Sequence, residues 1–283
     1  MSRVFLFLLL CFSVQVQAVP DWHWEDDFSR EECEALKDWV MHAEQGMVNL
    51  LGPLPFEYRV FFHRRHNSDE PVPWARTDKH SALDVYFHVD TTFPWNAFRE
   101  DWTAPHELTH LVFPYIHDEG RWFAEGIASY LQYQVMYAND TITWAEGMAE
   151  YRDRFKHAVA QGPKDMSIVD LSMVAGELGA YVRLYWGGAA FFMQADKRLY
   201  EEKGMRLNDV IRIYMHHHHG SRGSSVKRIL EIFDYISDST VFTETFNETV
   251  MQPRFPEYED ALAWLAKHPP ERSIVGDRTG TED

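Results

Sequence analysis

Cysteine is almost missing from this chain of 283 residues. Only Cys11 and Cys33 occur, and Cys11 lies in an apolar N-terminal stretch that we expect to be removed. A single remaining thiol cannot form an internal disulfide, so the hydrophobic core has to hold the fold. About 265 residues would remain after removal, which is long enough to bury a full core without covalent links.

Basic residues are also scarce. The chain has 27 lysines and arginines against 44 aspartates and glutamates, and its formal net charge is −17. Proteins that bind phosphate backbones cluster Lys and Arg, and no such cluster is present. We therefore expect no nucleic-acid partner. The excess of negative charge also disfavours anionic membrane surfaces, so we expect no membrane association of the mature chain.

Long apolar runs are absent beyond the N-terminus. The chain opens MSRVFLFLLLCFSVQVQA, with an apolar core at 4–14 and a small residue, Ala18, at its exit. That core is about half of the roughly 20 residues that a membrane-spanning helix requires. Residues 1–18 are therefore predicted to be a cleaved signal peptide, which makes the mature protein secreted or periplasmic. A lipoprotein signal at Cys11 is the alternative, disfavoured because Leu10 stands where such signals have a small residue.

Hydrophobic residues, in contrast, make up 45% of the chain and aromatic residues 15%, which is typical of a dense globular core. Up to residue 101 the pattern predicts a helix that opens with a capping box at Ser29 and Glu32. It also predicts strands at 56–65 and 82–90, joined by a polar loop at 66–81. From residue 102 onward the periodicity is helical. The predicted helices are 103–113, 122–137, 142–160, 179–203, 206–215, 224–234 and 257–267.

These elements predict an α+β fold that forms a single domain, residues 19–268. A small sheet-containing α/β part at 19–101 comes first, and a larger, mostly helical part at 102–268 follows. Residues 269–283 are polar and are predicted to be a tail without regular structure.

The segment APHELTHLVF carries the first chemical signal. His106 and His110 stand four residues apart on a short helix, so their imidazoles share one face. Two neutral imidazoles placed in this way can ligate one Zn²⁺ ion. Glu107 lies about 100° further around the helix, where it can reach a water molecule without being a metal ligand.

A catalytic zinc site needs a third protein ligand and one open position. A third histidine in the pattern H-E-x-x-H-x-x-G-x-x-H is excluded, because Phe113 and Ile116 occupy the positions of its glycine and histidine. His117 and Asp118 follow shortly after and remain candidates. Glu125 is the further candidate, in the amphipathic segment RWFAEGIASYLQ, which could fold back against the first helix.

Together, HELTH and WFAEGIASY resemble the gluzincin metallopeptidases, which include thermolysin and the aminopeptidase-N-like enzymes. The resemblance implies a zincin-like catalytic domain that acts on a peptide or protein substrate. It implies that His106, His110 and Glu125 bind Zn²⁺. It also implies that Glu107 is the general base.

A third segment, YVRLYWGGAAFFMQADKRL, is similar to the helix whose tyrosine steadies the oxyanion in aminopeptidase-N-like enzymes. Tyr185 followed by Gly188 matches the Y-x-x-G spacing, whereas Tyr181 does not, because Leu184 stands in the place of the glycine. The resemblance implies a catalytic role for Tyr185. The G-x-M-E-N segment that grips a free substrate amine in those enzymes is absent, so the choice between endopeptidase and exopeptidase stays open.

The sequence thus predicts a zinc metallopeptidase with a glutamate base. The strand at 82–90 is predicted to lie at the edge of the sheet and to pair with the substrate backbone. One alternative is a catalytically inactive zinc-binding protein on a protease fold. Another is a metal-handling protein centred on a histidine tract, His216, His217, His218 and His219. Asn139 and Asn247 head glycosylation sequons that matter only in a eukaryotic source. The oligomeric state stays open.

Overall fold

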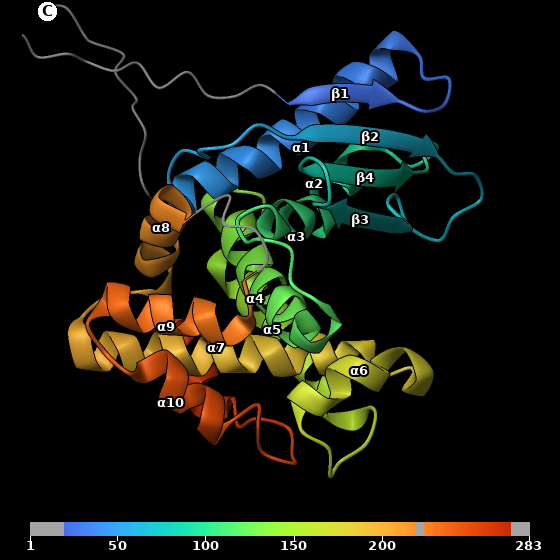
Figure 1. Cartoon of the computed structure of the whole chain (residues 1–283). Coiled ribbons are helices and arrows are strands. Elements are labelled where there is room, and N and C mark those ends of the chain that lie inside the picture. The colour runs from blue at the N-terminus through green and yellow to red at the C-terminus, as the bar shows by residue number, and fades with distance from the viewer. Residues whose placement is uncertain (1–19, 219–223, 273–283) are drawn as a thin grey trace, which may run out of the picture.

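The computed structural model describes residues 20–218 and 224–272 (Figure 1). It confirms the α+β class, with a small N-terminal sheet and a larger helical part. The signal peptide predicted at 1–18 lies outside the described residues. Within them, no helix combines the length and apolar character needed to cross a membrane.

The sheet has four strands in the order β1 (Asp21–Trp24), β2 (Arg59–Arg64), β4 (Asp84–Val89) and β3 (Trp74–Asp78). The first three of these run parallel, and β3 lies antiparallel to β4 at one edge. The helix α1 (Arg30–Leu51) connects β1 to β2. Its N-terminus carries the predicted capping box, in which Ser29 and Glu32 each accept the other's backbone N–H.

Two expectations for this part were wrong. Residues 66–81 are not a loop throughout, because β3 lies among them, with Arg76 and Asp78 on its outward side. An edge strand needs only one partner and tolerates such polar residues, which hides its strand pattern. The segment 82–90 is not the edge strand either. It forms β4, which lies between β2 and β3, and its alternate residues Val85 and Phe87 are fully buried.

The inner face of the sheet packs against α1. Trp39 of this helix lies edge-on to Phe87 of β4, with ring centroids 4.9 Å apart. Phe62 of β2 is also fully buried beneath the sheet. Burial of each large apolar side chain contributes about 1.5–3 kcal/mol. Since α1 also packs on α3 and α4, it holds the sheet beside the helices that carry the histidines and Glu125.

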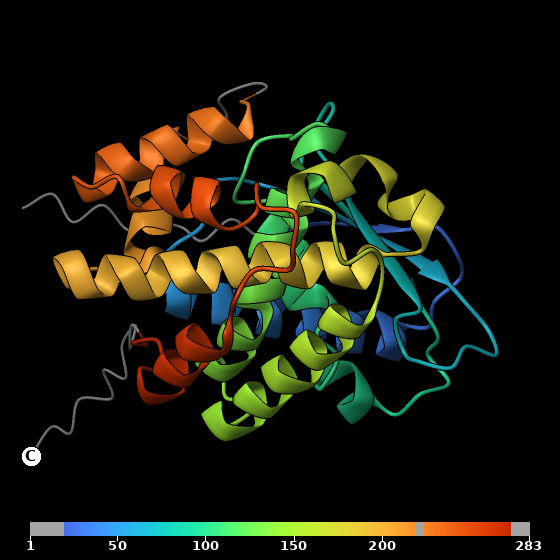
Figure 2. The same ribbon diagram turned by 90° about the horizontal axis from the view of Figure 1, so that it is seen from below.

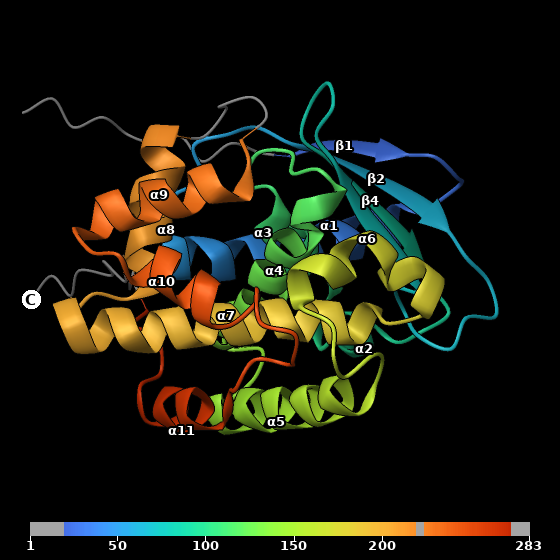
Figure 3. The same ribbon diagram turned by 60° about the horizontal axis from the view of Figure 1, so that its bottom comes forward.

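The helical part is built around one long helix, α7, which crosses its middle with α5 and α11 on one side and α9 and α10 on the other (Figures 2 and 3). The bounds of the helices after the sheet are α2 (Trp95–Arg99), α3 (Thr103–His110), the 3-10 turn η1 (Asp118–Gly120), α4 (Arg121–Ala138), α5 (Trp144–Ala160), α6 (Ile168–Leu178), α7 (Tyr181–Lys203), α8 (Leu207–His218), α9 (Val226–Ser237), α10 (Val241–Glu248) and α11 (Glu259–Lys267).

All seven helices predicted after residue 101 are present, with shifted ends, whereas α2, α6 and α10 were not predicted. The helix predicted at 179–203 begins at Tyr181, because Gly179 adopts a left-handed conformation with φ 60° and ends α6. The helix predicted at 103–113 ends at His110. Beyond it, Leu111 and Val112 donate to carbonyls three residues back, which tightens the chain before Pro114.

The start of the predicted polar tail is ordered against α4. Residues 269–272 belong to the described part, and the guanidinium of Arg272 lies 3.8 Å from the ring centroid of Tyr137 and pairs with Asp140. The remainder of the tail lies outside the described residues. Cys33 is a free thiol at a half-buried position of α1.

Candidate active site

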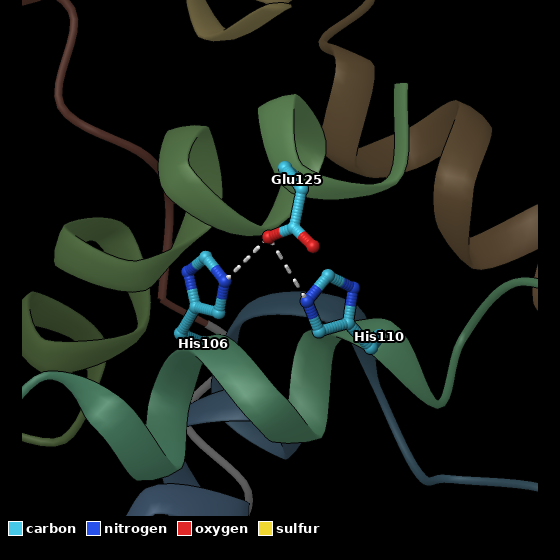
Figure 4. Close-up of side chains that lie close together, drawn as sticks. All are labelled: His106, His110 and Glu125. Carbon is cyan, nitrogen blue, oxygen red and sulfur yellow. Dashed lines mark hydrogen bonds and ion pairs between the residues drawn. The ribbon is translucent and has the colours of Figure 1, made fainter. Parts of the chain in front are cut away.

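The helices α3 and α4 bring the two histidines and Glu125 together (Figure 4). Nε2 of His106 lies 3.2 Å from Oε2 of Glu125, and Nε2 of His110 lies 3.6 Å from the same oxygen. One donor atom from each of the three residues lies within 4.8 Å of the others, and no second such group of His, Cys, Asp or Glu occurs in the described residues. These are the three predicted metal ligands.

Gln132 orients His106 from behind. Its Oε1 lies 2.9 Å from Nδ1 of His106 and can only accept, so Nδ1 carries a proton and Nε2 is the ring nitrogen that faces Glu125. Metal-binding histidines usually have such a second partner. Gln132 was not predicted, although it lies two helical turns after Glu125 on the same face of α4, which is a signal the sequence contains.

The three clustered groups stabilise positive charge among them. Burial opposes protonation of His106, but the hydrogen bond and charge of Glu125 outweigh it and raise the pKa of the imidazole. Burial alone would raise the pKa of Glu125, yet the charge of His110 and hydrogen bonds from both histidines lower it below its usual range. A divalent cation would supply the same charge, and two imidazoles with one carboxylate are a donor set that suits zinc with a position left open.

Glu107 is held by the edge strand. Its side chain is buried, and Oε2 accepts a hydrogen bond of 2.8 Å from the hydroxyl of Thr77 in β3. The same hydroxyl lies 3.1 Å from the main-chain oxygen of Glu107. Thr77 was not predicted as a site residue, because it fell in the segment that was expected to be a loop.

Tyr185 lies beside the cluster on α7. Its ring stacks toward that of His106 with centroids 6.2 Å apart and an interplanar angle of 24°. Burial raises the pKa of Tyr185 well above its ordinary value, so the phenol keeps its proton and remains a hydrogen-bond donor. Tyr181 also lines the cleft but is more exposed, at 42%.

Two glycines set the approach of α7 to α4. A Cβ added to Gly126 would come within 2.6 Å of the backbone of Gly188, and one added to Gly188 would come within 2.1 Å of the carbonyl oxygen of Trp122. Only glycine allows two helix backbones to lie this close. Because Gly126 follows Glu125 and Gly188 comes one turn after Tyr185, this contact fixes how near the phenol lies to the cluster.

These residues line an open cleft of about 820 Å³ between β3, α3, α4 and the start of α7. A volume of this size suits a short stretch of peptide or a small molecule. His117 and Asp118, the other candidate ligands, line the cleft near its entrance. Asp118 is exposed and pairs with Arg121. Neither His117 nor Asp118 belongs to the cluster around Glu125.

The histidine tract and the sequons lie elsewhere. His216, His217 and His218 end α8 and do not line the cleft, and His219 lies outside the described residues. Asn139 is buried, and its Nδ2 donates to the carbonyl oxygen of His42, so this amide is engaged in the folded chain. Asn247 is exposed at the end of α10.

No protein-family model matches the chain, and no curated protein is similar to it in sequence. Its structure is similar to that of an aminopeptidase N family protein from Idiomarina loihiensis, with a TM-score of 0.62 and 12% identity over 85% of this chain and 46% of that one. An M1 zinc metallopeptidase from Deinococcus radiodurans gives a TM-score of 0.48 and 16% identity over 80% and 46%. The similarity to the Idiomarina protein shows a shared fold. The lower similarity to the Deinococcus protein carries no further argument. The chain spans less than half the length of either protein.

Proposed function

We propose that this chain is a secreted or periplasmic zinc metallopeptidase that hydrolyses peptide bonds. The observation that carries the proposal is the cluster of His106, His110 and Glu125 in an open cleft, with a further carboxylate, Glu107, beside it. The fold shared with the Idiomarina protein supports it. Neither the fold nor the cluster alone would define a peptidase.

In this proposal His106, His110 and Glu125 hold the zinc ion. A bound zinc ion would supply Lewis-acid chemistry at the open position, lowering the pKa of water toward 7 and polarising the substrate carbonyl. Gln132 keeps His106 in the tautomer that exposes Nε2. The chain's other residues then have to bind the peptide, move a proton and stabilise the oxyanion.

Glu107 is the general base. Its carboxylate takes the proton from the attacking water and then delivers it to the leaving amine. Since Thr77 donates to Oε2 at 2.8 Å, Oε1 is the carboxylate oxygen that remains to take the proton. Thr77 thus acts as a positioning residue for the base.

Tyr185 and β3 complete the mechanism. The protonated phenol of Tyr185 donates a hydrogen bond to the oxygen that becomes negative, a role worth a few kcal/mol in comparable sites. The free edge of β3 pairs with the backbone of an extended substrate, because an unpaired strand edge offers alternating N–H and C=O groups. In this role β3 replaces the strand at 82–90.

The test combines zinc content with digestion of an unbiased peptide library by the purified mature chain. We expect one tightly bound zinc ion per chain and cleavage of library peptides. Replacing His106, His110 or Glu125 with Ala should strongly reduce zinc content. Glu107→Gln should keep zinc but abolish cleavage, because an amide of nearly the same shape cannot accept the proton.

Three outcomes would contradict the proposal. If Glu125→Ala keeps its zinc while His117→Ala or Asp118→Ala loses it, the ligand set is wrong. If the wild-type chain binds zinc yet cleaves no library peptide, it is a zinc-binding protein without peptidase activity. Removal of the histidine tract should leave the zinc ion in place, and loss of zinc there would favour the metal-handling alternative.

A further inference from the structure

A lysine lies inside the cleft without a carboxylate partner. Lys79 directly follows β3 and lines the cleft, and its Nζ donates to the main-chain oxygen of Phe113 at 3.0 Å. No carboxylate of residues 20–218 and 224–272 forms an ion pair with this ammonium group. Burial of an ammonium with only a neutral acceptor is unfavourable, so a group of this kind in a cleft points to a ligand that completes it.

The other cations of the cleft are neutralised by neighbours. Arg76 pairs with Asp78 at 3.1 Å, and its guanidinium also lies over the ring of Tyr86. Arg121 pairs with Asp118. Lys79 therefore differs from the two arginines in having no carboxylate in direct contact with its charged group.

The charge of Lys79 persists at neutral pH. Burial lowers the pKa of Lys79 to about 8, while the negative charges of Glu107 and Glu125 act in the opposite direction. Glu70 also lines the cleft, but Glu107 and Glu125 are the acids whose charges act on Lys79. With a divalent ion bound, the positive charges of the ion and Lys79 would exceed the negative charges of these two glutamates by one. A cleft with this balance attracts an anionic group of a substrate.

The direction of the Lys79 side chain follows from the strand. Thr77 and Lys79 lie two residues apart, so their side chains leave the chain on the same side, and both reach residues at or just beyond α3. Two residues of extended chain span roughly 7 Å. A peptide paired with β3 has the same rise, so the substrate group that meets Lys79 lies about two residues from the bond beside Glu107.

We propose that Lys79 binds a carboxylate of the substrate, within about two residues of the scissile bond. This inference rests on the proposed peptidase function and adds its substrate class. The carboxylate is either the free C-terminus of the peptide, which would make the enzyme an exopeptidase, or an Asp or Glu side chain, which would make it an acidic-specific endopeptidase. Both present the same charged oxygens to the ammonium group.

The experiment uses the zinc-loaded full chain and three sets of quenched fluorescent peptides. One set has a free C-terminus and neutral side chains, the second has an amidated C-terminus and a single Glu at successive positions, and the third is amidated and neutral. We expect the wild type to prefer one of the first two sets over the third. Preference for the free acid or for the Glu peptides identifies the source of the carboxylate.

Lys79→Met should remove that preference. It keeps the length of the side chain but not its charge, so kcat/KM for the preferred peptides should fall roughly 10- to 100-fold, the range for losing a charged hydrogen bond. Hydrolysis of neutral amidated peptides should change little, and Lys79→Arg should restore part of the preference. Arg121→Met is the matched control, because it changes the cleft charge equally but removes a cation that is already paired.

Binding gives a second readout that does not depend on turnover. In the Glu107→Gln background, calorimetric Kd values of the preferred peptides should rise by a similar factor when Lys79 is changed to Met.

If the wild type cleaves all three peptide sets at the same rate, the inference about Lys79 is wrong while the peptidase function stands. This outcome is measured on the wild type alone and does not depend on whether a variant folds. If Arg121→Met and Lys79→Met lower the preference equally, general electrostatics rather than Lys79 selects the substrate. If no peptide is cleaved at all, both proposals fall.

Discussion

The hydroxyl of Thr77 and the carboxylate of Glu107 are joined by a hydrogen bond of 2.8 Å that links the edge strand to the helix of the two histidines. The strand that is proposed to bind the substrate backbone therefore also holds the proposed base. The side chain of Thr77 thus links the pairing of a peptide with β3 to the orientation of the Glu107 carboxylate.

Thr77→Val should slow catalysis without loss of zinc. Valine has the shape of threonine but no hydroxyl, so Glu107 loses a hydrogen bond worth about 1.5–3 kcal/mol, and kcat should fall roughly tenfold or more while KM stays nearly constant. Thr77→Ser should restore most of the rate, because serine retains the donor. Steady-state kinetics with parallel zinc analysis checks this. Full kcat in the valine variant would show that the hydrogen bond has no catalytic role.

Tyr185→Phe should lower kcat by roughly 10²–10³-fold, the range for removing one oxyanion donor. Zinc content and thermal stability should barely change, because the ring and its stacking toward His106 remain. Tyr181→Phe is the control, since it removes a phenol at the more exposed position one turn earlier. A loss in Tyr181→Phe alone would assign the oxyanion role to that residue instead.

Gly188→Ala should destabilise the protein and disturb the site. The added methyl would lie 2.1 Å from the carbonyl oxygen of Trp122, and overpacking of this kind costs about 1–3 kcal/mol. Because α7 has to move, kcat should fall along with the melting temperature. Gly187→Ala is the matched control, since its methyl would meet the side chain of Ile168 rather than backbone of α4. Equal losses in the two variants would argue against the helix contact as the cause.

Acid should weaken the link between α1 and the sheet. Arg64 donates to both carboxylate oxygens of Glu32, at 2.9 and 3.0 Å, and mainly for this reason the pKa of Glu32 falls from 4.5 to about 2. A lowered pKa stabilises the fold above the unfolded value of 4.5, and the contribution is lost as the pH falls from there toward 2.

Glu32→Gln should therefore lower the free energy of unfolding at neutral pH, by about 1–3 kcal/mol. The difference between variant and wild type should shrink at about pH 3, because unfolding at that pH takes up a proton at Glu32. Urea unfolding at the two pH values measures this. A difference that does not depend on pH would mean that packing rather than charge is responsible.

Local patterns were sufficient for the residues that share one helix. The spacing of His106 and His110 is a property of a single turn, and the segment around Glu125 has its own amphipathic period. The helices that carry them were predicted within a few residues. The capping box before α1 is equally local, because its two partners lie three residues apart.

Contacts between segments that are distant in the sequence could not be predicted from local patterns. The inner face of β3 presents only Ala75 and Thr77, so the strand lacks the β-branched and aromatic alternation that identified its neighbours. Nothing local shows which strand of a sheet lies at the edge, and Thr77 and Lys79 were missed for that reason. The contact of Gly126 with Gly188 likewise depends on how two separate helices cross.

The free edge of β3 also bears on how the protein behaves at high concentration. An unpaired strand edge is where identical chains join into aggregates. Here the strand has five residues, Pro73 directly before it has no N–H to donate, and Arg76 and Asp78 are charged. We expect so short a ladder to hold a peptide that gains other contacts in the cleft, but not to join two copies by backbone pairing alone. The edge that we propose to bind peptides can therefore stay open to solvent without driving aggregation by itself.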